Sequence, residues 1–476
     1  MAERRPAAGS NGRANTVMAM LALCGVIVSL QQTMVVPLLP EFPTLLGISV
    51  DDASWLVTAT LLTGAVSTPV VSRLADMYGK RRMIVVALAV MVTGSVLGAL
   101  AHEHFAAVIL ARVLQGVGMA LVPVGMAMMR DVLPAERVPL GVSLMSGTLA
   151  IGAGAGLPLA GLLVDRFAWY SIFWATALVG AALLVGAVRI LPESPLATGG
   201  RFDLPGAVVL SAGLCLALLS VSKGGQWGWT APVTLGTAAG GAALLALWVP
   251  MTLRAAHPLI DLRAASRPAV ALVNFCAVLT GFGMFANMLI TTQRLQLPTA
   301  DGLGLTTLES GLWLAPGALV FGFMAPVAAA MIRRLGAELT LAVGGGTMCA
   351  AYALRTFFDS TLFEVVAGSI VVSAGTSLAF AAMPVLIMAM APITETASAN
   401  GLNTLLRALG TSTSSATLAA VGAASTVVVA GVPYPSGDAL VTVLWFAAAA
   451  SGAALLVALS LLLVRPGGAP GRSVLS

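Results

Sequence analysis

Residues 72–82 read Ser-Arg-Leu-Ala-Asp-Met-Tyr-Gly-Lys-Arg-Arg, and an apolar run lies on each side of them. The runs 54–71 and 83–101 are close to the roughly 20 residues that an α-helix needs to cross the hydrocarbon core of a bilayer. Four basic side chains in so short a connector favour its placement on the cytoplasmic side. This stretch therefore predicts two membrane-spanning helices joined by a tight cytoplasmic turn.

The composition extends this prediction to the whole chain. Of the 476 residues, 58% are hydrophobic and 9% are charged, and the mean hydropathy is +0.98. An ordinary soluble enzyme has about 25% charged residues, and a disordered chain has low hydrophobicity, so both classes are excluded. The net charge of +5 does not indicate a nucleic-acid partner, because the basic residues form no dense stripe. The four cysteines lie far apart in apolar segments and predict free thiols with no disulfide or metal site.

Apolar runs recur along the chain and predict an all-α polytopic membrane protein with fourteen transmembrane helices. The predicted spans are 16–39, 54–71, 83–101, 105–129, 138–164, 171–188, 204–221, 231–253, 269–292, 311–332, 339–354, 362–390, 400–429 and 439–464.

The basic residues support this count. With both termini in the cytoplasm, 18 of the 24 lie in cytoplasmic connectors and tails, four lie in outer connectors, and Arg112 and Arg407 lie within spans. This is a strong positive-inside bias. We therefore expect a multi-pass protein of the plasma (inner) membrane with both termini cytoplasmic.

A second connector, residues 329–338, resembles the first. It reads Ala-Ala-Met-Ile-Arg-Arg-Leu-Gly-Ala-Glu, and in both connectors a small residue, a charged residue and a glycine are spaced four and then three apart. The repetition predicts two six-helix bundles with inverted repeats, plus two extra helices between them, as in transporters whose halves rock about a central site. The expected organisation is a cytoplasmic N-terminal tail (1–15), an N-terminal bundle (16–190), a linker with the extra helix pair (191–253), a C-terminal bundle (254–464) and a cytoplasmic C-terminal tail (465–476).

Three motifs carry a resemblance to a known family. Residues 76–82, Asp-Met-Tyr-Gly-Lys-Arg-Arg, resemble the loop signature of the major facilitator superfamily, and residues 112–118, Arg-Val-Leu-Gln-Gly-Val-Gly, resemble its Arg-x-x-Gln-Gly-x-Gly motif. Residues 152–161 resemble its antiporter motif, with the proline one place late and Ala160 in place of a glycine. Together with fourteen spans, the chain is similar to the fourteen-helix drug:proton antiporter branch. The resemblance implies alternating access driven by the proton gradient.

The motifs also suggest residues that control conformation. An ion pair of Asp76 with Arg81 or Arg82 would latch one state of the transporter, with Lys80 beside it and Gly79 permitting the turn. In span five, small residues let a second helix approach closely and a proline adds a kink. These span-five residues are Gly152, Gly156, Gly161 and Pro158.

Arg112 is the most informative single residue, because a charge inside a bilayer costs several kcal/mol unless it is paired or hydrated. It lies at about the same depth as Gln31, which replaces the acidic residue usual in the resembled branch and cannot carry a proton. We expect the Arg112 guanidinium to donate to the Gln31 side-chain oxygen, with Gln115 one turn away. The alternative is that Arg112 binds backbone carbonyls and only holds the packing.

Other candidates lie along the predicted pathway. Asn274, Asn287 and Met383 would line an adaptable pocket, or else fill space between helices. Glu41, Glu309 and Glu364 are the nominated carboxylates for a proton path, although each also fits a solvated acid at a helix end.

The function expected from these features is a secondary active transporter that exports amphipathic small molecules, such as a drug, an antibiotic or a natural product, by proton antiport. Its partners would be a small-molecule substrate, protons and the lipid bilayer. The alternative is a uniporter, or an importer of a metabolite or nutrient. No catalytic constellation, metal-ligand cluster or phosphate-binding Gly-Lys-Ser/Thr loop occurs, so we expect neither an enzyme nor an ATP-driven pump, and no cofactor.

Overall fold

The computed structural model describes residues 8–39, 41–193, 199–256, 258–297, 302–429 and 432–464. Within them the chain is almost entirely helical, and twelve helical segments are long and apolar enough to cross a membrane. Two further helices of 29 residues, α7 (Val138–Arg166) and α17 (Thr396–Ala424), are not counted in these twelve and pack against several of them. The predicted tail 465–476 and residues 1–7 of the other tail lie outside the described residues.

The N-terminal half is a bundle of helices around two apolar clusters. Its elements besides α7 are α1 (Ala8–Thr33), η1 (Val36–Leu38), α2 (Phe42–Leu46), α3 (Val50–Tyr78), α4 (Lys80–Leu100), α5 (Phe105–Gly116), η2 (Val117–Ala120), α6 (Leu121–Val132), η3 (Ala135–Arg137) and α8 (Ser171–Ile190).

The C-terminal half repeats this plan around its own core. Its elements besides α17 are α12 (Pro268–Gln296), α13 (Thr307–Phe323), α14 (Ala325–Leu335), α15 (Ala337–Arg355), α16 (Leu362–Met390), η4 (Ile393–Glu395), β1 (Thr426–Val429), β2 (Val432–Pro435) and α18 (Gly437–Val464).

Between the halves in sequence come α9 (Leu204–Trp227), α10 (Pro232–Arg254) and the short α11 (Leu262–Ala265). Helix α9 packs on α3 and α17, and α10 packs on α9. The extra pair therefore covers one side of the seam at which the two halves meet.

The two connectors that were similar in sequence also share their backbone geometry. Gly79 joins α3 to α4 with φ of +103°, and Gly336 joins α14 to α15 with φ of +90°. A side chain strains the backbone in this region, so glycine allows each helix pair to turn back within one residue. We call the end of the bundle that carries these turns the basic end.

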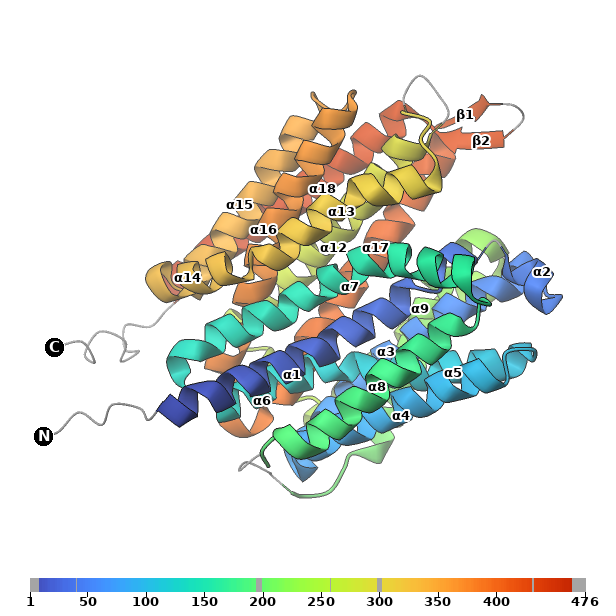
Figure 1. Ribbon diagram of the computed structural model, residues 1–476. Helices are drawn as coiled ribbons and strands as arrows, with labels where there is room; N and C mark the ends of the chain where they lie inside the picture. The colour runs from blue at the N-terminus through green and yellow to red at the C-terminus, as the bar shows by residue number, and fades with distance from the viewer. Residues whose placement is uncertain are drawn as a thin grey trace, which may run out of the picture.

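Helices α3 and α7 of the first half pack against α17 and α13 of the second (Figure 1). In the same view α14 lies at the basic end, while α2 and the β1–β2 hairpin lie at the opposite end (Figure 1).

The fold is nearly all-helical, as predicted, with one short β-hairpin, which corrects the prediction that span thirteen reaches Val429. Helix α17 ends at Ala424, and Thr426–Val429 pairs antiparallel with Val432–Pro435, with Val429 opposite Val432. Four β-branched residues in a row favour a strand over a further helical turn.

Candidate functional site

The Asp76 carboxylate joins the two halves at the basic end, and we call its contacts with the start of α17 the clasp. Asp76, near the end of α3, accepts hydrogen bonds from the backbone N–H of Ser398 (2.8 Å), its hydroxyl (2.7 Å) and the N–H of Ala397 (3.2 Å). These residues begin α17, where the N–H groups have no partner inside the helix and the helix dipole favours an anion. The completely buried Asp76 carboxylate thus acts as a cap supplied by the other half of the molecule.

Lys80 completes this clasp, which corrects the predicted ion pair. Its Nζ lies 3.6 Å from Asp76 Oδ1 and 2.7 Å from Asp131 Oδ2, and all three side chains are buried. The predicted partner Arg81 instead binds Glu193 and the carbonyl of Val188. The turn at Gly79 directs Lys80 back along α3, whereas the next residue points toward the end of α8.

Two more polar contacts join the halves in the same part of the bundle. Arg73 and Glu395 form an ion pair of 3.3 Å beside the clasp. Deeper in, the Ser146 hydroxyl of α7 donates to the carbonyl of Phe380 in α16 at 3.0 Å. The halves are therefore closed against each other at the basic end.

Arg112 lies in a second buried cluster, inside the N-terminal half. Its Nε donates to the Leu56 carbonyl at 2.8 Å, and its Nη1 donates to the Gln31 carbonyl at 3.0 Å and to Gln115 Oε1 at 2.7 Å. The Gln115 amide in turn donates to the Ser95 hydroxyl at 2.9 Å. The three acceptors of Arg112 are neutral oxygens, so dipoles rather than a carboxylate compensate this charge.

The structure brings Gln31 and Arg112 together but corrects the predicted bond. The guanidinium binds the backbone oxygen of Gln31, while the Gln31 side chain donates to the Gln115 carbonyl at 2.9 Å. Gln31 lies in the last turn of α1, where carbonyls lack an intrahelical partner and attract the nearest donor. Backbone binding, the alternative considered for Arg112, is what occurs, and Gln31 Oε1 is buried with no partner among the described residues.

The glycines of α7 divide into two groups. A Cβ added at Gly152 would lie 2.3 Å from Ser29 Cβ, and one added at Gly156 would lie 1.8 Å from Thr33 Oγ1, so both allow α1 to pack closely. A Cβ at Gly161 would meet nothing within 4 Å. Pro158 lies on an exposed face of the continuous helix.

We expect Gly152→Ala to destabilise the protein by about 1–3 kcal/mol, because the added methyl group overpacks the seam between α1 and α7. Gly161→Ala is the matched control and should leave stability unchanged or slightly higher. Thermal unfolding of the purified variants in detergent measures the difference. Equal unfolding temperatures for Gly152→Ala and Gly161→Ala would show that Gly152 is not needed for close packing of α1 on α7.

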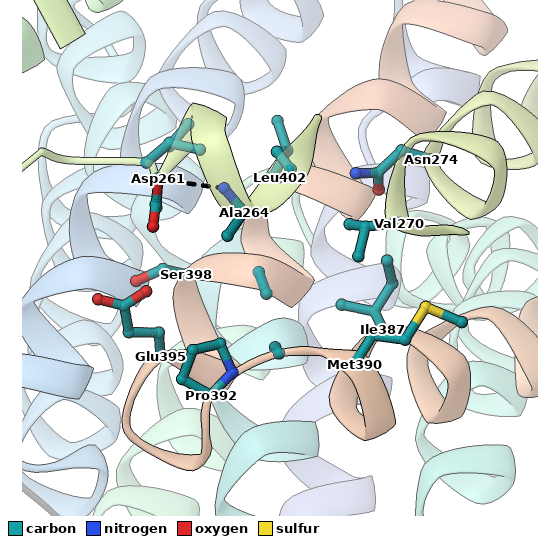
Figure 2. A pocket seen from close by; sticks show the side chains of 14 residues that line it. Asp261, Ala264, Val270, Asn274, Ile387, Met390, Pro392, Glu395, Ser398 and Leu402 are labelled. Atoms are coloured by element: carbon teal, nitrogen blue, oxygen red, sulfur yellow. Dashed lines mark hydrogen bonds between the residues drawn. The ribbon is translucent and has the colours of Figure 1, made fainter. Parts of the chain in front are cut away.

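The predicted pocket residues are not brought together. Asn274 Oδ1 accepts from Asn403 Nδ2 at 3.1 Å and faces a cavity of about 40 Å³ near the clasp (Figure 2). Asn287 donates to Ser369 Oγ at 3.0 Å, and Met383 is completely buried in the core. The cavity has room for one or two water molecules rather than a substrate.

The three nominated carboxylates are at helix starts, away from both buried clusters. Glu309 accepts from the N–H of Thr306 at 2.9 Å, and Glu364 accepts from the N–H of Thr361 at 2.9 Å, each within a capping box. Glu41 is exposed at the N-cap position of α2. Their contacts are those of helix-end acids, which was the other interpretation of these residues.

A buried carboxylate in the C-terminal half was missed. Asp359 binds Arg355 Nε at 2.8 Å and Arg294 Nε at 3.2 Å, and Arg355 Nη1 also donates to Asn287 Oδ1 at 2.9 Å. The four-residue spacing of Arg355 and Asp359 was the available signal. The cluster braces α12, α15 and the connector before α16 at the end opposite the clasp.

Comparison with known proteins identifies the family. The family model described as Major Facilitator Superfamily matches residues 21–415. The chain belongs to the major facilitator superfamily. It is thus a multi-span membrane transporter and not an enzyme.

Relatives within this superfamily include named resistance proteins. Multidrug resistance protein Stp of Mycobacterium tuberculosis is 28% identical over 394 residues, which is 81% of this chain and 72% of that protein. The tetracenomycin C resistance and export protein of Streptomyces glaucescens is 29% identical over 344 residues, 71% of this chain. That match spans 62% of the Streptomyces protein, less than two thirds of its length.

Solved structures share the fold at low identity. The human organic anion transporter MFSD10 (TETRAN) has a TM-score of 0.64 and 18% identity, with 94% of this chain and 99% of that chain covered. The proton:xylose symporter XylE has a TM-score of 0.66 and 11% identity, with 96% and 97% covered.

Proposed function

We propose that this superfamily member exports amphipathic small molecules across the plasma membrane by alternating access. The observation that carries the proposal is the clasp of Asp76 on the start of α17, a contact between the halves that can open and close as a unit. The resemblance to Stp and to the tetracenomycin C exporter supports export of drug-like molecules.

We infer fourteen spans, with α7 and α17 added to the twelve apolar segments. Each has 29 residues and is about 43 Å long, enough to cross a bilayer. Helix α7 is mostly apolar, and the more polar α17 packs against α3, α6 and α12. Fourteen spans would fit the fourteen-helix branch, and we propose that the basic end and both termini lie in the cytoplasm.

In this orientation the clasp closes the cytoplasmic side, as in an outward-facing state. Opening requires Asp76 to leave α17 and the Arg73–Glu395 pair to separate. Gly154 of α7 also lies at the seam between the halves, because a Cβ added there would lie 2.6 Å from Ala318 Cβ of α13 in the other half. Small residues here let the halves slide past each other.

We propose proton antiport as the energy source, on the similarity of residues 152–161 to the antiporter motif. Gln31 cannot be the proton carrier, so coupling uses another group. Uniport or import is the alternative that the assay must separate.

The test is transport by purified protein in proteoliposomes, with amphipathic fluorescent dyes of positive, zero and negative charge. An exporter driven by protons should move at least one dye when a pH gradient is imposed. The pH of the vesicle lumen should change at the same time as the dye moves. Loss of dye movement on collapsing the gradient supports antiport. Movement that only follows the dye gradient indicates uniport, and no movement of any dye overturns the proposal.

A further inference from the structure

Arg407 differs from the other buried charges in the part of the chain that the structure describes. It is the twelfth of 29 residues in α17 and is 7% exposed. The centre of its guanidinium group lies 4.6 Å from the ring centroid of Phe380, yet it forms no hydrogen bond or ion pair with any residue that the structure describes. Arg112, by contrast, is held by three neutral oxygens.

A guanidinium group in this position needs an acceptor. Its N–H donors are costly to leave unpaired in a low-dielectric interior, so the group must contact water or a ligand. The Phe380 ring attracts the guanidinium group through a cation–π contact, which uses none of its N–H donors.

Arg407 also lies close to the seam between the halves. Its Cγ would be 3.1 Å from a Cβ added at Gly281 of α12, so it is packed between α12 and α16. The carbonyl of the same Phe380 accepts the hydrogen bond from Ser146 of the N-terminal half. A molecule passing between the halves would come within reach of this side chain.

Among the residues that the structure describes, no acidic side chain pairs with Arg407. Each of the 19 acidic residues lies in a tail, a connector or a short helical turn, or within four residues of the end of a long helix. The buried carboxylates of Asp76 and Asp131 are engaged with Lys80, and that of Asp359 is engaged with Arg294 and Arg355. The interior of the bundle is therefore positively charged.

We propose that Arg407 binds an anionic group of the transported molecule, so that the substrates are amphipathic organic anions with a carboxylate, sulfonate or ionised phenol. This inference rests on the proposed export function. A planar guanidinium binds a carboxylate or a sulfonate through two parallel hydrogen bonds and an ionised phenol through its single oxygen, which gives both affinity and orientation. A membrane potential that is negative inside also favours the exit of an anion.

The test uses three probes that share one fluorophore: dansylglycine (anionic), dansylamide (neutral) and dansylcadaverine (cationic). Wild-type protein in proteoliposomes should transport dansylglycine best. Arg407→Gln should weaken dansylglycine transport and binding about tenfold, the effect of losing one charge-assisted hydrogen bond, and should leave dansylamide unchanged. Arg407→Lys should restore most of the dansylglycine signal, and Arg407→Glu should favour dansylcadaverine.

Arg254→Gln, an exposed arginine at the end of α10, is the matched control and should behave as wild type. Binding of dansylglycine to detergent-solubilised protein and thermal unfolding separate a lost site from a misfolded variant. Equal weakening of all three probes in Arg407→Gln, or preference of the wild type for dansylcadaverine, overturns the inference and leaves export standing. Failure of every probe, including the wider dye panel, overturns both.

Discussion

Replacing Asp76 by asparagine should abolish most transport and shift the protein toward states that are open at the basic end. The carboxylate accepts three hydrogen bonds from the start of α17 and faces Lys80 Nζ at 3.6 Å. Hydrogen bonds to a charged group contribute about 1.5–3 kcal/mol each. A loss of about 3 kcal/mol changes the ratio of closed to open states by more than a hundredfold.

Distances between spin labels measure this shift directly. Arg82 and Arg334 are exposed on opposite halves at the basic end, so labelled cysteines there should move apart in Asp76→Asn. Ser398→Ala, which removes one of the three bonds, should give an intermediate effect. Asp438→Asn, an exposed acid in the first turn of α18, is the control and should leave the distance unchanged. An unaltered distance distribution in Asp76→Asn, with transport retained, would exclude the clasp as a gate.

The second large effect is expected for Arg112→Ala. Removal of the guanidinium leaves the Gln31 carbonyl and Gln115 Oε1 without their donor in a site that is 1% exposed. Each unsatisfied buried acceptor costs about 1–3 kcal/mol, so we expect a loss of about 3 kcal/mol in stability together with loss of transport. Arg112→Lys should not restore function, because one ammonium group cannot reach oxygens on α1, α3 and α5 together.

Thermal unfolding and dye transport are the two measurements for this variant. Arg166→Ala, an exposed residue at the end of α7, is the matched control. Gln31→Ala removes only the bond to the Gln115 carbonyl and should cost about 1 kcal/mol. Wild-type stability and transport in Arg112→Ala would show that the cluster neither braces the bundle nor serves the pathway.

The sequence was sufficient to predict which residue types form the buried cluster of the N-terminal half and how deep in the membrane they lie. Arg112 had to find acceptors inside the membrane, and its depth correctly placed it beside Gln31. Which oxygen it binds was not predictable, because that depends on where α1 ends and on how the Gln31 side chain turns toward α5. Glu309 and Glu364 each follow a threonine by three residues, so the sequence itself contains the capping signal that explains their positions.

The sequence by itself determined the helical membrane architecture, the two similar glycine turns and the family. The length of an apolar run and the placement of charges are local properties, and they fix where a chain crosses the bilayer. Only the tertiary structure decided which partners the charges take. Asp76 meets Ser398, and Arg407 meets Phe380 but no acid, because contacts across the seam depend on how two helical halves pack, and no local pattern encodes that geometry.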